Sequence, residues 1–385
     1  MTRLEASWLT DPASVAVMDA LWEGYFVGGC VRNALLGAGV TDLDIATPHP
    51  PEESVRLLEA AGLKAVPTGL SHGTITAVHE GTPIEVTTFR ADVATDGRHA
   101  EVAFTTDMAT DAARRDFTMN ALYADREGQV VDPLGGLPDL EARRVRFIAC
   151  AEDRIREDYL RILRFFRFHA WYGAEGIDAD GLAACAELAD GLDGLARERV
   201  GWEFRKLLAA PDPAPAMASM ASAAVLMRCL PGADPMALAP LVHLEQQAGI
   251  APDWPTRLAA IGGEDPTSRL RLSKAETLEQ ATIRKALDLQ DRPVAEIAYR
   301  AGAMAAHRAA LVVAASVGGA LPDRLDAEIR RGAEARFPLR AKDLLNAGYT
   351  PGPQVGTALV VQEEAWIASD FKLSRDELLS RLPPA

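Results

Sequence analysis

The spacing of hydrophobic residues divides the chain into two regions of different character. Over the first 150 residues, short apolar stretches bounded by Gly, Pro, Asp or His are typical of strands. From about Glu152 onward, apolar positions recur at helical spacing in long segments rich in Leu, Ala and Arg. We therefore predict an α+β protein, in which a small mixed β-sheet with helices is followed by an all-α remainder. The predicted strands are Tyr25 to Val27, Asp42 to Ala46, Thr74 to Val78, Ile84 to Phe89 and Gln129 to Val131.

Composition narrows the class of protein. Hydrophobic residues make up 48% and charged residues 25% of the 385 positions, which is ordinary for a folded globular protein. The net charge of -15 argues against indiscriminate binding to nucleic acid or to an anionic membrane. The four cysteines lie far apart, which favours reduced structural thiols over a zinc site or a disulfide framework. We find no signal peptide, transit peptide or membrane-spanning stretch and predict a cytoplasmic protein.

A two-glycine turn lies between a predicted strand and a predicted helix. Gly28 and Gly29 are followed three residues later by Arg32. Glycines let backbone N–H groups approach a ligand, a helix N-terminus favours an anion, and Arg32 can add a charge-assisted bond to a phosphate. On its own, such a turn is more often only a tight connection.

Three acidic residues follow on predicted strands. Asp42 and Asp44 are two positions apart, so a strand would point both carboxylates to one face and turn Leu43 into the core. Carboxylates that close repel each other unless a cation lies between them, and oxygen ligands suit Mg²⁺. Glu85 is a third acid, although without this context it would more often be an exposed strand residue. A D-x-D pair is usually a solvated strand end, but after a phosphate-binding turn it suits phosphoryl or nucleotidyl transfer.

Two further clusters combine arginine with hydrogen-bonding side chains. Arg115, Asp116 and Asn120 can bind a triphosphate and a ribose, or they can form a salt-bridged helix start. Asp158 and Arg161 are spaced as neighbours on one helix. A carboxylate beside a guanidinium offers the acceptors and donors needed to read the Watson–Crick edge of a base. The alternative for this pair is a surface ion-pair ladder.

Taken together, these motifs resemble those of the class II tRNA nucleotidyltransferases, which are the bacterial CCA-adding enzymes and their poly(A) polymerase relatives. In order, the motifs are GGCVRN, DLD, SHGT, IEVTTFR, RRDFTMNAL, DPLGG and EDYLRILRFFRF. The resemblance implies a nucleotidyltransferase head over residues 1–148, a helical neck with a nucleotide-base template over 149–210, and a tRNA-binding helical body and tail over 211–385.

The resemblance also implies the reaction. C, C and A would be added from CTP and ATP to the tRNA 3′ end without a nucleic-acid template. Attack by the 3′-hydroxyl would be in line and assisted by two Mg²⁺ ions, with release of pyrophosphate. No membrane and no obligatory protein partner are expected. The alternatives are a poly(A) polymerase of the same family, a metal-dependent phosphohydrolase, and a non-catalytic RNA-binding scaffold.

Site roles follow from the resemblance position by position. Asp42 and Asp44 match the metal-binding aspartates, and Glu85 matches the third catalytic carboxylate. Asp158 and Arg161 match the amino-acid template that pairs with the incoming base. The nucleotide-binding positions are Gly28, Gly29, Arg32, Arg115, Asp116, Asn120, Asp158, Arg161, Arg164 and Arg167.

The sequence departs from the family pattern at two places, with Asn33 where Asp is usual and Tyr159 where Pro is usual. Residues 90–99 match the family's flexible loop, which is implicated in adding adenosine, so an enzyme that adds only C is not expected.

Residues 140–172 carry a local charge of +3 against -18 elsewhere. We therefore predict a concentrated, salt-sensitive RNA contact on the head-to-neck side.

Overall fold

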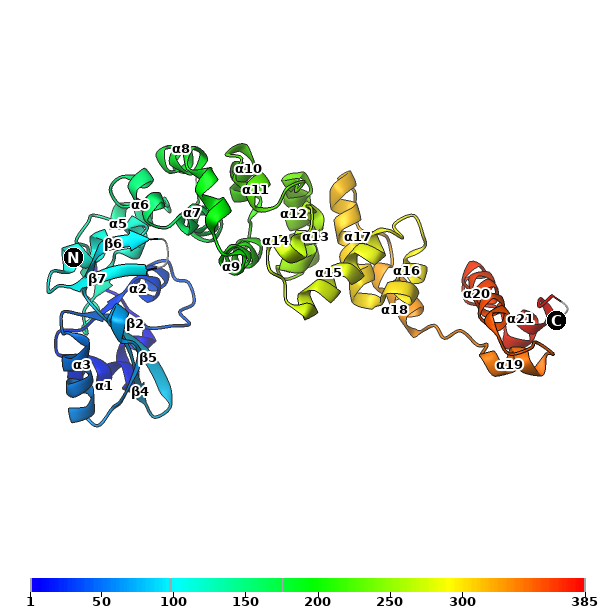
Figure 1. Ribbon diagram of the computed structural model, residues 1–385, viewed down its shortest axis with the longest axis horizontal. Helices are drawn as coiled ribbons and strands as arrows, with labels where there is room; N and C mark the ends of the chain where they lie inside the picture. The colour runs from blue at the N-terminus through cyan, green and yellow to red at the C-terminus, as the bar shows by residue number, and fades with distance from the viewer. Residues whose placement is uncertain (1, 97–98, 175, 384–385) are drawn as a thin grey trace. The chain divides into compact units, whose positions relative to one another are not determined.

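The computed structural model describes residues 2–96, 99–174 and 176–383, with the backbone alone for those of residues 92–101 that it includes (Figure 1). It divides into two compact units, which are described separately here. Unit 1 holds the chain up to residue 236 together with residues 262–272, and unit 2 holds residues 237–261 and those from 273 onward. The domain boundaries at 148 and 210 stay predictions. No helix in the described ranges is both long and apolar enough to cross a membrane.

A seven-stranded mixed sheet forms the base of unit 1, in the order β3-β4-β5-β2-β1-β8-β9. The β2 and β5 strands are parallel and every other neighbouring pair is antiparallel. A separate antiparallel pair, β6 and β7, covers much of the predicted flexible loop, of which residues 97 and 98 lie outside the described residues. The strands are β1 (Tyr25–Val27), β2 (Asp44–Thr47), β3 (Lys64–Gly69), β4 (Thr74–His79), β5 (Thr82–Thr88), β6 (Arg90–Asp96), β7 (His99–Phe104), β8 (Tyr123–Ala124) and β9 (Val130–Val131).

Each of the five predicted strands has a counterpart in the sheet, but one boundary was wrong in a way that affects the site. The β2 strand begins at Asp44, so Asp42 precedes the strand and Leu43 is only half-buried rather than in the core. The reason is pairing: the register of β2 with β5 starts where Asp44 lies opposite Glu85. The β3, β6, β7 and β8 strands were not predicted.

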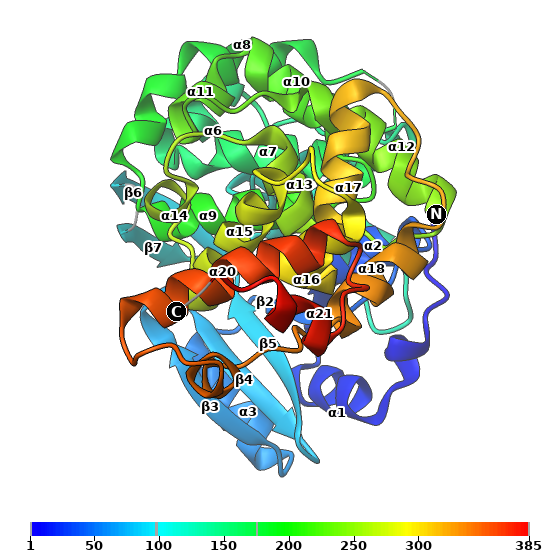
Figure 2. The same ribbon diagram turned by 90° about the vertical axis from the view of Figure 1, so that its right-hand side faces the viewer.

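Two helices, α1 and α3, pack on the strands β3, β4 and β5, and Figure 2 shows α3 behind these strands. A core of buried residues that includes Val27, Phe89 and Tyr123 lies at the other end of the sheet. The helices of unit 1 are α1 (Pro12–Leu21), α2 (Gly29–Leu35), α3 (Pro51–Ala60), α4 (Met108–Ala113), α5 (Leu137–Glu141), α6 (Ala151–Glu157), α7 (Leu160–Tyr172), α8 (Ala179–Glu187), α9 (Arg197–Leu208), α10 (Ala214–Ser222), α11 (Val225–Cys229) and α14 (Pro266–Arg269).

Four phenylalanines join the α7 helix to two segments of unit 1, one just before β8 and one just after α5. Phe117 and Phe147 form an isolated β-bridge, and their rings contact Phe165 and Phe168 of α7 at centroid distances of 5.0 to 6.3 Å. All four side chains are at most 5% exposed. Because burying a large aromatic ring contributes about 2–3 kcal/mol, this cluster fixes α7 against the head.

Unit 2 is helical throughout its described residues, which with the mixed sheet of unit 1 confirms the predicted α+β class. One of its cores includes Ile297, Ala309 and Ile329, and another includes Leu344 and Trp366. Its helices are α12 (Leu238–Ala248), α13 (Trp254–Ile261), α15 (Lys274–Leu287), α16 (Val294–Ala301), α17 (Ala303–Val317), α18 (Leu325–Glu334), α19 (Ala341–Asn346), α20 (Pro353–Ala368) and α21 (Arg375–Ser380).

Candidate active site

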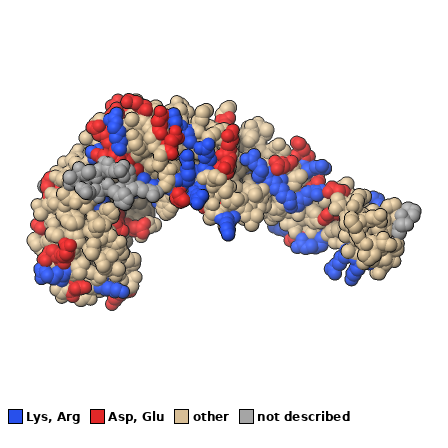
Figure 3. Space-filling view, in the orientation of Figure 1, with Lys and Arg blue, Asp and Glu red and all other residues tan. Residues whose placement is uncertain are grey.

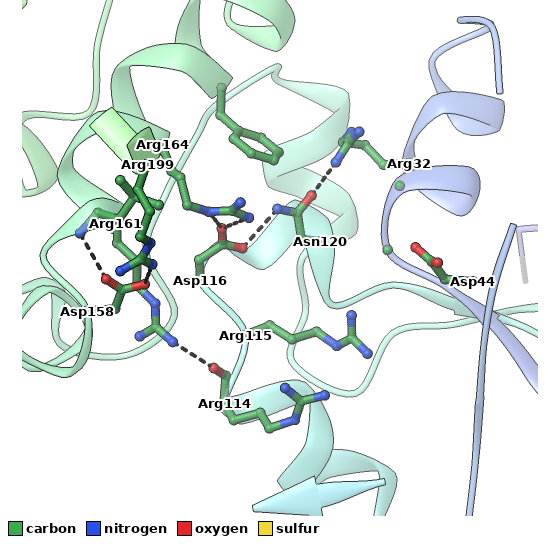
Figure 4. Close-up of a pocket in the computed structure, with 14 residues that line it drawn as sticks. Arg32, Asp44, Arg114, Arg115, Asp116, Asn120, Asp158, Arg161, Arg164 and Arg199 are labelled. Carbon is green, nitrogen blue, oxygen red and sulfur yellow. Dashed lines mark hydrogen bonds and ion pairs between the residues drawn. The ribbon is translucent and has the colours of Figure 1, made fainter. Parts of the chain in front are cut away.

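A cavity of about 450 Å³ in unit 1 gathers most of the predicted site residues. Its walls come from the glycine turn, the start of β2, the segment after α4 and the helices α7 and α9. Figure 4 shows the polar side chains converging on this space. The lining residues are Gly28, Gly29, Arg32, Asp44, Arg114, Arg115, Asp116, Asn120, Asp158, Leu160, Arg161, Arg164, Phe168 and Arg199.

A chain of hydrogen bonds crosses the cavity wall from α2 to α7 (Figure 4). Arg32 donates to the Asn120 side-chain oxygen at 2.5 Å, and the Asn120 amide donates to Asp116 at 2.9 Å. Arg164 donates to the other Asp116 oxygen from Nε at 2.7 Å and from Nη2 at 2.5 Å. Although burial opposes ionisation of Asp116, Arg164 and Asn120 hold the pKa of its carboxyl below the usual range. Asp116 therefore fixes two neighbouring polar side chains in place.

Arg32 is only 6% exposed and lies against two rings of α7. Its guanidinium carbon lies 4.1 Å from the Tyr172 ring centroid and 5.1 Å from that of Phe168. Burial lowers the pKa of Arg32, and the Tyr172 hydroxyl, which accepts a hydrogen bond at 2.8 Å, opposes that change. The Asn33 amide oxygen accepts two hydrogen bonds from Arg32 at 3.1 and 2.8 Å. Asn33 thus supplies an acceptor without adding a negative charge.

The buried carboxylate of Asp111, which sequence reasoning did not single out, holds two cavity arginines. It accepts hydrogen bonds from Arg114 at 2.9 Å, Arg115 at 3.0 Å and the Tyr123 hydroxyl at 2.7 Å. Burial disfavours the charge of Arg115, but Tyr123 and Asp111 raise its pKa above the usual value. The adjacent Gly28 has a φ of 71°, and a Cβ there would lie 3.4 Å from the Arg115 Nη1 atom. Glycine at position 28 leaves room for this guanidinium.

The acidic side of the site lies where β2 and β5 begin to pair. Asp44 lines the cavity opposite Glu85 in the strand register, whereas Asp42 and Glu85 do not line it. Partial desolvation and the nearby Glu85 and Asp42 charges raise the pKa of Asp44, and Arg115 opposes this rise.

Mutual repulsion among these carboxylates favours a bound cation. Within the described ranges no three His, Cys, Asp or Glu side chains form a metal cluster. The residues still fit Mg²⁺, which often uses one or two carboxylates together with substrate phosphates and water.

The predicted pairing of Asp158 with Arg161 on one helix was wrong. Asp158 lies between α6 and α7, where its carboxylate forms an ion pair with Arg199 of α9 at 2.6 Å and accepts a bond from the Leu160 N–H at 3.1 Å. Arg161 instead pairs with Glu157 at 2.5 Å. Both still line the cavity, with each side chain held by a partner of its own. Nothing in the sequence assigned Arg199 to the site.

Tyr159 completes the connection between α6 and α7. A Cβ built on Gly191 would fall 1.9 Å from the Tyr159 ring, so the ring packs directly on this glycine. In place of the usual proline, Tyr159 anchors the connection by contact with the 3₁₀ turn Ala189–Gly194, and α7 begins at Leu160.

Arg167 lies outside the cavity lining, unlike the other predicted nucleotide-binding residues. It is bound to Glu203 at 2.5 Å and its guanidinium lies over the Phe168 ring. Other arginines of residues 140–172 are also paired, so that positive and negative side chains alternate over the helices after the sheet in Figure 3. The pairs are Arg144 and Arg146 with Asp139, Arg154 and Arg161 with Glu157, Arg156 with Asp153, and Arg164 with Asp116. The salt-sensitive contact predicted for this segment stays a prediction.

Comparisons with known proteins agree with this geometry. Residues 24–146 match a family described as the poly(A) polymerase head domain, and residues 176–236 match the probable RNA- and SrmB-binding site of polymerase A. The mitochondrial CCA tRNA nucleotidyltransferase 1 of Danio rerio is 35% identical over 92% of this chain and 86% of its own length. The CCA-adding enzyme of Lacticaseibacillus paracasei is 32% identical over 97% and 94%.

Solved structures agree as well. The CCA-adding enzyme of Bacillus stearothermophilus, crystallised with CTP, matches with a TM-score of 0.75 and 29% identity over 98% of this chain and 97% of that one. The Thermotoga maritima CCA-adding enzyme complexed with tRNA shares the fold, with a TM-score of 0.70 at 19% identity over 99% and 98%. With its cavity, its fold and its relatives along nearly the whole sequence, the chain belongs to the class II CCA-adding tRNA nucleotidyltransferases.

Proposed function

We propose that this chain adds C, C and A, from CTP and ATP, to the 3′ end of tRNA and releases pyrophosphate at each step. The observation that carries the proposal is the single cavity that joins an acidic strand end, a group of fixed arginines and the Asp158–Arg161 region. Template-free nucleotidyl transfer needs these three parts together: a place for the reacting phosphate, binding of the triphosphate, and selection of the base.

The arginines would bind the triphosphate. Six guanidinium groups line the cavity, and the acidic residues Asp111 and Asp116 hold three of them from behind. Groups fixed before the substrate arrives lose little freedom when they bind it, and they stabilise charge that shifts from the α-phosphate to the leaving pyrophosphate. The Asn120 side chain, which is held between Arg32 and Asp116, would contact the ribose.

Asp42 and Asp44 would hold Mg²⁺, with Glu85 as the neighbouring third carboxylate. When bound there, Mg²⁺ supplies charge neutralisation at the phosphates and favours ionisation of the attacking hydroxyl. Of these carboxylates Asp44 lines the cavity, and the repulsion among the three would be relieved in the loaded state. Burial and the neighbouring Glu85 raise the pKa of Asp44, and Arg115 opposes that rise and so favours the ionised carboxylate.

Asp158 and Arg161 would read the incoming base. Because Arg199 and the Leu160 N–H hold Asp158, and Glu157 holds Arg161, the two template groups keep separate fixed positions. A base that places a donor against Asp158 and an acceptor against Arg161 would satisfy both, whereas one with the reverse pattern would set donor against donor and acceptor against acceptor in this partly buried site. A missing hydrogen bond of this kind costs about 1–3 kcal/mol, enough to select among nucleotides.

The test is to incubate the protein with tRNA lacking its 3′ CCA, labelled CTP and ATP, and Mg²⁺, and then to sequence the added nucleotides. We expect C, C and A in that order, with one pyrophosphate released per addition. A long A-tail would instead identify a poly(A) polymerase. Nucleotide hydrolysis without RNA extension would support a phosphohydrolase, and no Mg²⁺-dependent labelling would support a non-catalytic RNA-binding scaffold.

A further inference from the structure

Two exposed tryptophans and a lysine lie together on the helices α7 and α9. Trp171 is 42% and Trp202 55% exposed, although large aromatic rings usually contribute to a core. The Trp171 Nε1 donates to the Lys206 backbone oxygen at 2.7 Å, and the Lys206 ammonium lies 4.4 Å from the Trp202 ring centroid. We call these three residues the tryptophan platform. Its two rings and one cation are open to solvent.

The platform continues the wall of the nucleotide cavity. On α9, the cavity residue Arg199 lies three positions before Trp202, so the two are neighbours along one helix face, with Lys206 a further turn along. On α7, the cavity residue Phe168 lies three positions before Trp171. Both helices therefore lead from the cavity to the platform within about one turn, or about 5.4 Å of helix.

The charge of Lys206 is influenced by both sides of the site. Its pKa is lowered by partial desolvation and by Arg167 and Arg164, while Glu203 and Asp42 oppose this. Lys206 is thus close enough to sense the proposed metal-binding aspartate as well as an arginine of the nucleotide cavity. Among the described residues Lys206 has no ion-pair partner, and it is exposed. A phosphate is the ligand that complements a cation in this position.

We propose that the tryptophan platform binds the unpaired 3′ end of the RNA that is being extended, with a terminal base stacked on Trp202, the more exposed of the two rings, and a backbone phosphate at Lys206. The inference rests on the proposed function, because the 3′-hydroxyl must come close to Asp42 and Asp44. The last nucleotides before that hydroxyl must then pass over the edge of the cavity. The platform extends this edge.

Stacking suits this task better than hydrogen bonding to base edges. The terminal base of the growing RNA differs from one addition to the next, whereas a flat aromatic ring accepts every base through its π-face. Selection of the incoming nucleotide is already proposed for Asp158 and Arg161 on the cavity side. The platform would therefore hold the RNA end without reading its sequence.

The test compares two labelled RNA hairpins, one with a short unpaired 3′ end and one with a blunt end, in binding assays without nucleotide. We expect the wild type to prefer the hairpin with the unpaired end. Trp202→Leu should bind that hairpin about 5- to 150-fold more weakly, which is the range for loss of one stacked base. Its affinity for the blunt hairpin should be unchanged, and Trp202→Phe should recover most of the loss because it keeps a ring.

Trp22→Leu is the matched control, since Trp22 is 63% exposed at the end of α1 and belongs to neither the cavity nor the platform. Equal losses for both hairpins, or Trp202→Leu binding as well as Trp202→Phe, would overturn the proposal. So would a rise in the KM for CTP at saturating RNA in place of weaker RNA binding. Failure of the wild type to add nucleotides would instead refute the proposed function, because end-dependent RNA binding is measured independently of catalysis.

Discussion

Asp116→Asn tests whether the hydrogen-bonded chain across the cavity wall organises the nucleotide site. Asp116 is 7% exposed and accepts hydrogen bonds from Arg164, from Asn120 and from the Phe117 N–H. The substitution keeps the shape of the side chain but removes its charge and replaces one acceptor oxygen with a donor. It leaves the Arg164 guanidinium without its carboxylate and places two amide groups together at positions 116 and 120.

The expected loss of stability follows from the exposure of the two partners. Removing one member of a fully buried ion pair costs about 3–5 kcal/mol, because the other charge is left unpaired. Arg164 is 33% exposed, so water compensates part of this, and we expect a loss of about 2–3 kcal/mol in the free energy of unfolding. Freeing Arg164 should also weaken CTP and ATP binding by about 10- to 100-fold, equivalent to one charge-assisted hydrogen bond.

Denaturant unfolding at pH 7 and CTP titration of the folded protein measure these two effects. Asp19→Asn is the control, because it removes an exposed ion pair with Arg126 at 2.9 Å and should change stability by less than about 0.5 kcal/mol. If Asp116→Asn behaved like this control in stability and bound CTP normally, the proposed organising role of Asp116 would be refuted.

The pH dependence of the same pair of proteins gives an independent check. Since the pKa of Asp116 in the folded protein lies below its unfolded value, its ionised form contributes stability above the unfolded pKa of about 3.9. This contribution is lost as the pH falls through the lower pKa of the folded state. The difference in unfolding free energy between wild type and Asp116→Asn should therefore be largest near neutral pH and shrink below about pH 4.

Further substitutions address three other parts of the site. Asp42→Ala should abolish addition of both C and A. The free energy of unfolding should stay near that of the wild type, because this exposed residue lies outside the sheet. Retained turnover would contradict its role as a metal ligand. Asp158→Ala or Arg161→Ala should degrade selection among CTP, ATP, UTP and GTP more than Mg²⁺ dependence, and unchanged selectivity would exclude the template role. Gly28→Ala should weaken nucleotide binding far more than Gly29→Ala, because only position 28 has a positive φ. A residue with a side chain is strained by about 1–3 kcal/mol in that backbone conformation. Equal effects of the two substitutions in a CTP titration would contradict this reasoning.

The features that the sequence revealed are local ones. Alternating apolar residues gave the main strands, and the glycine turn followed by Arg32 needed only its own neighbours to be recognised. The β3 strand was missed because Pro67 interrupts an apolar run, and an edge strand, which is what β3 is, tolerates proline. The start of β2 was misplaced because a strand end is set by its partner strand, which the pattern of one segment does not contain.

The site residues that were missed or mispaired depend on contacts between distant segments. Asp158 is bound to Arg199, 41 residues later, rather than to Arg161 three residues away. Asp111 reads as an ordinary acid near a helix start, and only the fold shows that it is 1% exposed and shared by two arginines. Ion-pair partners are selected by tertiary packing, and hydrophobic periodicity carries no information about which charges will meet.

The bond between Arg32 and Tyr172 has a consequence for protein synthesis. These two residues are 140 positions apart in the chain, and Asp158 likewise has its ion-pair partner, Arg199, 41 positions later. A nascent chain that has released only the sheet strands therefore contains the acidic residues and the glycine turn but no assembled nucleotide site. The site closes once the α9 helix has left the ribosome. An incomplete chain that ends before this point is unable to consume CTP or ATP, so abortive translation products of this protein should be catalytically silent.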